Sequence, residues 1–180
     1  QPTPMILALS IHYSRASDLV RPDYVVSNPS VPVAAYRDLF GNWCSRLVAP
    51  AGQAVFLDVR PRDKFEAGHA AGAIWLNLAE WSEKSRSARE GFSDTAGWRQ
   101  RIGALGITAS DRVVVYDDGE LVEAARVWYI LQLFGVRNAS VLNGGYPALA
   151  AETKGAHIAT GAPTSPQARS FIPATDDRPL

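Results

Sequence analysis

The sequence has little of what several common classes of protein require. Its 180 residues contain one cysteine, Cys44, which excludes an internal disulfide and a metal site built from several cysteines. No apolar run approaches the roughly 20 residues that a membrane-spanning helix needs. Lys plus Arg and Asp plus Glu each number 18, and without a basic run nothing favours nucleic acid as a partner. What remains is a globular composition, 47% hydrophobic and 20% charged, of a length that suits one domain.

Composition divides the chain into three parts. Residues 1–32 mix prolines with scattered apolar residues, which predicts an irregular N-terminal arm. Residues 33–152 carry the periodic segments of a folded domain. Residues 153–180 are rich in Thr, Ala, Gly and Pro, which is typical of a linker. The first residue is Gln1, and the sequence is compatible with a periplasmic or secreted location as well as a cytoplasmic one.

The central part alternates between strand and helix patterns. This alternation predicts βαβ units and a mostly parallel sheet with helices on both faces, an α/β fold. Asp94 is expected to cap a helix, and Gly106 and Gly135 to end helices. Cys44 lies beside an apolar stripe at helical spacing. Strands are expected at 54–60, 71–78, 113–116 and 140–145, helices at 33–47, 94–105 and 121–135, and a solvated loop at 82–89.

Several segments resemble the rhodanese family. FLDVRPRDKFEAGHAAGAIWLNL, at 56–78, resembles its strand ending in Asp-Val-Arg, acidic–aromatic turn and Gly-His-x-x-Gly-Ala motif. VVVYD, AARVWYILQLFG and SVLNGG resemble the second half of the same domain. Together they cover about 55–151 and imply a rhodanese-like fold with a five-stranded, mainly parallel sheet. The residues at 125–128, Ala-Arg-Val-Trp, resemble the N-terminal, non-catalytic domain of tandem thiosulfate and 3-mercaptopyruvate sulfurtransferases.

The loop after the 113–116 strand corresponds to the family's active-site loop. Such a loop needs a thiolate nucleophile, a ring of backbone N–H groups and a positive environment, and a helix N-terminus lowers a thiol pKa. Aspartate stands at the nucleophile position. The acids of this segment favour the helix dipole by about 0.3–1 kcal/mol each and repel an anionic substrate. We therefore expect no catalytic residue in this vacated loop, which consists of Asp117, Asp118, Gly119, Glu120, Leu121 and Val122 and is followed by Glu123.

Four residues are candidates for the rim of the loop: Asp58, Arg60, His69 and Arg126. In the family, the pair that matches Asp58 and Arg60 orders nearby loops. His69 is interpreted as a structural hydrogen-bonding residue, because the loop offers no nucleophile for it to serve as a base. No cofactor and no metal site is expected.

Three other interpretations stay open. Asp117 could accept a phosphoryl group, since dual-specificity phosphatases share this fold, although they need a loop cysteine and a following arginine. Asp117, Asp118 and Glu120 could hold Ca²⁺ or Mg²⁺, although their spacing matches no known cage. Cys44 could carry sulfur from outside the loop, although a lone cysteine on an apolar stripe usually belongs to the core.

The resemblance implies a role as the non-catalytic rhodanese-like domain of a sulfurtransferase. Its partner would be a second rhodanese domain with a catalytic cysteine, in the same gene product or in a separate chain. The alternative is a stand-alone binding or regulatory module without sulfur transfer. A reading frame that continues past Leu180 into a cysteine-bearing domain would favour the first. Trp81 follows a strand end and could face such a partner or pack under its own loop.

Overall fold

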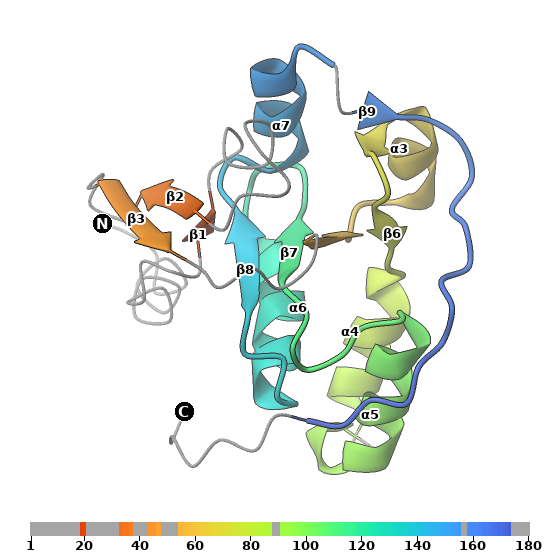
Figure 1. Cartoon of the computed structure of the whole chain (residues 1–180). Coiled ribbons are helices and arrows are strands. Elements are labelled where there is room, and N and C mark those ends of the chain that lie inside the picture. Colours follow the sequence, from red (N-terminus) through yellow and green to blue (C-terminus); the bar gives the residue numbers. More distant parts are fainter. Residues whose placement is uncertain are drawn as a thin grey trace, which may run out of the picture.

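A parallel sheet forms the centre of the computed structural model (Figure 1). The structure describes residues 54–87, 91–155 and 158–173, together with the strand backbones at 19–20, 33–37 and 43–47. The strand order is β1-β8-β7-β4-β6, and every neighbouring pair is parallel. The strands are β1 (Leu19–Val20), β8 (Ala139–Leu142), β7 (Val113–Tyr116), β4 (Val55–Asp58) and β6 (Ile74–Trp75). Four strands make up the sheet among residues 54–173, and a fifth rests on two-residue β1 alone.

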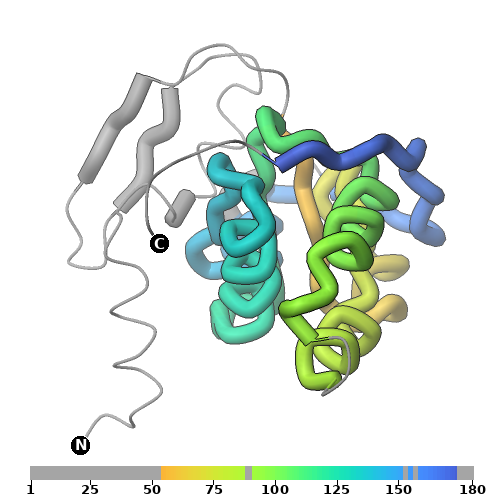
Figure 2. Tube along the Cα trace, turned by 90° about the horizontal axis from the view of Figure 1, so that it is seen from below, coloured from red at the N-terminus to blue at the C-terminus, as the bar shows by residue number. Residues whose placement is uncertain are grey.

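Helices cover both faces of this sheet, as the alternating pattern predicted. Strand side chains alternate between two cores: Val113 and Val115 lie in one, Val114 and Tyr116 in the other. The larger core lies under α4 (Leu78–Arg86), α5 (Thr95–Ala104) and α6 (Val122–Leu133), with the 3₁₀ turn η2 (Gly91–Ser93) beside α4. The smaller core lies under α3 (Arg62–Ala67) and α7 (Gly145–Thr153). Figure 2 shows α6 and α5 in a view from below.

The predicted helix at 33–47 is wrong. The chain forms an antiparallel hairpin there, β2 (Val33–Arg37) and β3 (Trp43–Leu47). Gly41 and Asn42 between the two strands favour a turn over a helix interior, and the apolar spacing suits a strand pair as well. Cys44 pairs with Tyr36 across the hairpin backbone, but its side chain lies outside the described residues. The predicted arm at 1–32 also lies outside the described residues, apart from the backbone of β1.

Two boundaries in the central part also differ from expectation. The solvated loop predicted at 82–89 is wrong through residue 86, because α4 continues to Arg86. In this helix, Trp81 is buried edge-on against Trp98, with ring centroids 5.4 Å apart, so it packs within its own domain. Lys84 is buried in the same helix and pairs with Asp94 at 2.6 Å, which allows a charged segment to pack against α5. The strand expected at 71–78 shortens to Ile74–Trp75.

The residues after α7 pack against the domain, although their composition is that of a linker. Strand β9 (Ile158–Ala159) pairs with β5 (His69–Ala70) in antiparallel fashion. The extended segment 160–171, here called the C-terminal strap, then runs to α5 (Figure 1). The Arg169 N–H donates to Gly103 O at 2.8 Å, and Phe171 is buried in the larger core. Among the helices described, none has the length and hydropathy to cross a bilayer.

Candidate functional site

The loop between β7 and α6 is built around the carboxylate of Asp117. This residue follows the last position of β7, and its exposed fraction is 2%. Its Oδ1 accepts the N–H groups of Gly119 at 2.8 Å and Leu121 at 3.2 Å, and its Oδ2 accepts that of Ala124 at 3.1 Å. The ring of amides expected in the loop is therefore present, and the chain's own carboxylate occupies it.

The Asp117 carboxylate provides acceptors for N–H groups at the start of α6. The first N–H groups of a helix have no partner within the helix, and a buried donor without an acceptor costs about 1–3 kcal/mol. Leu121 adopts a left-handed conformation with φ 67°, which is uncommon for a residue with a side chain. That turn helps to bring the amides of the loop and of the first helical turn toward one point, where Asp117 accepts them.

The glycine turn after β8 packs directly on this loop. Gly144 and Gly145 both have positive φ, 81° and 58°, and a Cβ on Gly145 would lie 2.4 Å from Asp117 O. The next residue, Tyr146, donates its N–H to Asp117 O at 2.8 Å. These glycines make a backbone turn, as interpreted from the sequence, and the close approach explains why no side chain fits there.

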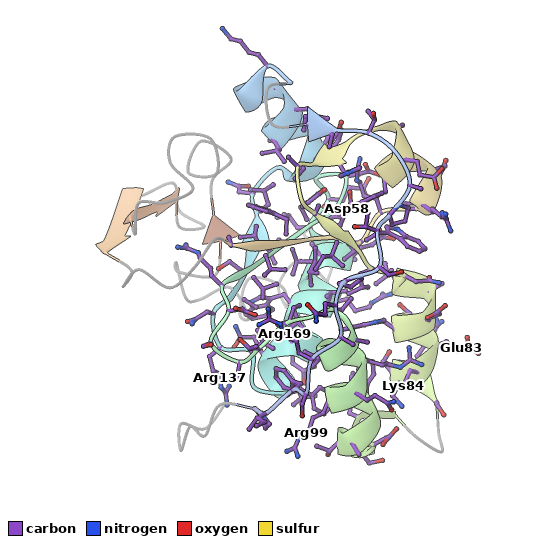
Figure 3. The ribbon with its side chains drawn as sticks, turned by 45° about the vertical axis from the view of Figure 1, so that its right-hand side comes forward. Asp58, Glu83, Lys84, Arg99, Arg137 and Arg169 are labelled. Atoms are coloured by element: carbon purple, nitrogen blue, oxygen red, sulfur yellow. The ribbon has the colours of Figure 1, made fainter. Side chains whose placement is uncertain are left out.

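A buried ion pair lies beside the loop. Asp58 ends β4 with an exposed fraction of 0%, and Arg60 has 3% (Figure 3 labels Asp58). Arg60 Nη2 lies 2.6 Å from Asp58 Oδ2, and Nε lies 3.0 Å from Oδ1. Nη2 also donates to Gly68 O at 2.6 Å, and the guanidinium stands 3.9 Å from the ring centroid of Tyr146. The pair thus ties β4, α3 and α7 together.

Burial and neighbouring charge keep Arg60 and Tyr116 protonated. Burial lowers the pKa of Arg60, but the hydrogen bond and charge of Asp58 outweigh this effect and the pKa is raised. Burial raises the pKa of Tyr116, and the charge of Asp58 raises it further. The Tyr116 hydroxyl accepts the Ala70 N–H at 3.0 Å. Neither Arg60 nor Tyr116 is therefore poised as a base near neutral pH.

Asp118 has cations beside it, which the sequence analysis did not foresee. Its Oδ2 accepts a hydrogen bond from Lys64 Nζ on α3, and its Oδ1 lies 3.9 Å from Arg60 Nη1. The hydrogen bond from Lys64 to Asp118 raises the pKa of Lys64. The negative charge of Asp118 is therefore partly compensated by Lys64 and Arg60. Glu120 and Glu123 are exposed to solvent.

The carboxylates proposed as cation ligands have other partners. Asp117 accepts three backbone N–H groups, and Asp118 pairs with Lys64. Within the part of the chain that the structure describes, no three His, Cys, Asp or Glu side chains come together as metal ligands. The geometry gives the calcium or magnesium interpretation no support.

The remaining rim candidates lie in different surroundings. His69 is buried next to Gly68, its Nδ1 lies 2.7 Å from Phe65 O, and its ring stacks on Phe65 with centroids 3.8 Å apart. These contacts fit the structural role interpreted for it. Arg126 is exposed on α6 and donates from Nη1 to Ser82 Oγ on α4 at 3.2 Å. The structure therefore brings together Asp58, Arg60 and Asp118, with His69 adjacent, and joins Arg126 to another helix.

Sequence reasoning missed two residues of this cluster. Lys64 lies 54 positions before its partner Asp118. Tyr146 contacts Arg60 although it lies in α7, much later in the sequence. No local pattern signals a contact over such a separation. The direct packing of the Gly144–Gly145 turn on the loop could have been inferred from the adjacent glycines, since paired glycines mark close backbone approach.

Sequence comparisons show which known proteins this chain resembles. The sequence model of the rhodanese-like domain family matches residues 42–152. Thiosulfate sulfurtransferase of Bos taurus is 34% identical over 112 residues, which cover 61% of this chain and 37% of that protein. Thiosulfate/3-mercaptopyruvate sulfurtransferase 2 of Arabidopsis thaliana is 33% identical over 87 residues, 48% of this chain and 25% of that protein. The chain thus spans well under half the length of these relatives.

Solved structures share the fold. SseA from Escherichia coli, described as a 3-mercaptopyruvate sulfotransferase, matches with a TM-score of 0.62 at 18% identity and covers 88% of this chain and 57% of that chain. A 3-mercaptopyruvate sulfurtransferase from Leishmania major matches with a TM-score of 0.52 at 22% identity, over 66% of this chain and 35% of that chain. The expected rhodanese-type α/β fold is confirmed, and the chain belongs to the rhodanese-like domain family.

Proposed function

We propose that this chain is a non-catalytic rhodanese-like domain of a sulfurtransferase of the thiosulfate or 3-mercaptopyruvate type. The observation that carries the proposal is the position of Asp117. A carboxylate stands where the family resemblance places the sulfur-carrying cysteine, and it accepts the N–H groups of Gly119, Leu121 and Ala124. A carboxylate cannot form a persulfide, and an oxyanion would have to displace it from all three amides.

The domain would act by packing against a second rhodanese domain that bears the catalytic cysteine. The bovine and Arabidopsis relatives are named as sulfurtransferases, and this chain covers 37% and 25% of them, which leaves room for such a domain in proteins of that kind. The resemblance implies an active site near the interface between the two halves. The role of this half would then be to shape the substrate pocket and to carry no sulfur itself.

A sulfurtransfer assay tests the proposal. Residues 1–180 should give no thiosulfate:cyanide sulfurtransfer above background, and mass spectrometry after incubation with thiosulfate should find no persulfide on Cys44. Turnover that disappears in Cys44→Ser would overturn the proposal in favour of sulfur transfer by that residue. The partner is tested by adding a cysteine-bearing rhodanese domain, linked or separate, and measuring its kcat/KM. No change would favour the stand-alone binding module.

A further inference from the structure

A groove lies between α5 and the C-terminal strap, away from the β7–α6 loop. Its volume is about 400 Å³, within the range of roughly 300–1,000 Å³ that is typical of small-molecule sites. One wall is α5, with Arg99, Gln100 and Ala104, and the other is the strap, with Arg169, Ser170 and Phe171.

The backbone fixes the width of this groove. Gly103 on α5 accepts the Arg169 N–H at 2.8 Å, and a Cβ at Gly103 would lie 2.2 Å from Arg169 O. Phe171 is buried in the larger core and anchors the end of the strap. The two walls are therefore held together by a hydrogen bond, a close backbone contact and a buried ring.

The charge of the groove is positive and unmatched. Both charged residues of the lining are arginines, and neither Arg99 nor Arg169 has a side-chain partner among the residues described here. The neighbouring Arg101 instead faces Glu80, with Nη1 3.9 Å from Oε2. A protein with equal numbers of acidic and basic residues thus has two guanidinium groups free to receive anions, and a guanidinium fork matches a carboxylate in two parallel hydrogen bonds.

The separation of the two arginines along the groove favours an elongated ligand. Figure 3 labels Arg169 and Arg99 at different levels along α5, and the lining also includes the apolar side chains of Ala104 and Phe171. We propose that this groove binds a linear small molecule with a carboxylate at each end and an aliphatic middle. One carboxylate would pair with Arg99 and the other with Arg169, while Gln100 and Ser170 supply further hydrogen-bond donors.

Titration with linear dicarboxylates tests this site. In nitrogen-15 NMR spectra of the full chain, glutarate, adipate, pimelate and suberate should shift the side-chain Nε signals of Arg99 and Arg169 and the Arg169 amide saturably. One chain length should bind best, at least about ten-fold more tightly than acetate. Because a hydrogen bond to a charged group contributes a free energy equivalent to about a ten-fold to hundred-fold change in affinity, Arg99→Ala and Arg169→Ala should each weaken binding by at least about ten-fold. Arg62→Ala, an exposed arginine on α3 paired with Glu66, is the matched control and should leave binding unchanged.

A second variant tests the shape of the groove without removing its charged residues. Gly103→Ala keeps both arginines but displaces the strap, so binding should be lost while the circular dichroism spectrum remains that of a folded protein. Binding as tight as that of the wild type in Gly103→Ala, or in either arginine variant, would overturn the proposal. Equal binding of inorganic sulfate, or no preference for chain length, would mean an adventitious ion only. No step of this test involves sulfur transfer, so its outcome is independent of the proposed function.

Discussion

Replacement of Asp117 by alanine removes the acceptor that three backbone N–H groups share. The Ala124 amide belongs to a fully buried residue, whereas Gly119 and Leu121 are half-buried. Water can therefore replace part of the lost hydrogen bonding near Gly119 and Leu121 but has little access at Ala124. Since a buried unsatisfied donor costs about 1–3 kcal/mol, we expect Asp117→Ala to lower the free energy of unfolding by about 3 kcal/mol.

Urea denaturation followed by circular dichroism measures this loss. With a slope of about 2 kcal/mol per molar urea, the midpoint should fall by roughly 1.5 M. Asp117→Asn keeps one acceptor oxygen but turns an NH₂ group toward a backbone N–H, so about half of the loss should remain. Asp118→Ala is the matched control, because its partner Lys64 is half exposed and such surface pairs contribute about 1 kcal/mol or less. Equal losses in Asp117→Ala and Asp118→Ala would refute the role assigned to the amide ring.

Three further predictions concern the same loop and the ion pairs. Asp117→Cys should restore little thiosulfate:cyanide sulfurtransfer, because exposed acids remain in the loop; a substantial rate would show that their charge is no barrier. Arg60→Ala leaves the buried Asp58 carboxylate unpaired, so the free energy of unfolding should fall by about 3–5 kcal/mol; a loss under 1 kcal/mol in urea would contradict this. The hydrogen bond from Lys84 lowers the pKa of Asp94 below its ordinary value of 3.8, so this pair stabilises the fold above that pH and ceases to do so as the pH falls through the lowered value. The stability difference between wild type and Asp94→Asn should therefore be constant near neutral pH and shrink in acid; a difference that grows in acid would contradict the pairing.

Local signals account for the parts of the fold that the sequence predicted well. The run Val113–Tyr116, three valines and a tyrosine, is fully buried as expected of a central strand. Asp94 caps α5 by accepting the Gly97 N–H at 2.9 Å, and Gly106 and Gly135 adopt positive φ after the helices that they end. Each of these features depends on residues within a few positions of one another.

Contacts between distant segments account for the rest. The charge of residues 82–89 predicted a solvated loop. Lys84 pairs with Asp94 and Trp81 packs on Trp98, however, so the half-buried helix α4 continues to Arg86. The C-terminal strap has linker composition, yet Gly103 allows its backbone to approach α5 closely. Local propensity predicts neither the helix nor the packed strap, because each depends on contacts with a distant segment of the chain.

In the candidate site, too, the sequence predicted local features but not the contacts between segments. The family resemblance placed Asp117 at the vacated nucleophile position, but only the structure shows its carboxylate accepting the amides of its own loop. The sequence analysis also predicted no cation beside Asp118, whereas Lys64 and Arg60 approach it from α3 and the end of β4. The proposed barrier to anion binding thus has two parts, the amide ring that Asp117 occupies and the exposed acids Glu120 and Glu123 beside it.

The most direct test of the account is persulfide formation on the purified chain. Residues 1–180 are incubated with thiosulfate, or with 3-mercaptopyruvate, and the intact mass is measured before and after cyanide is added. The account predicts an unchanged mass and no thiocyanate. A mass gain of one sulfur atom that cyanide removes would contradict it, and the same experiment on Cys44→Ser would show whether that thiol carried the sulfur.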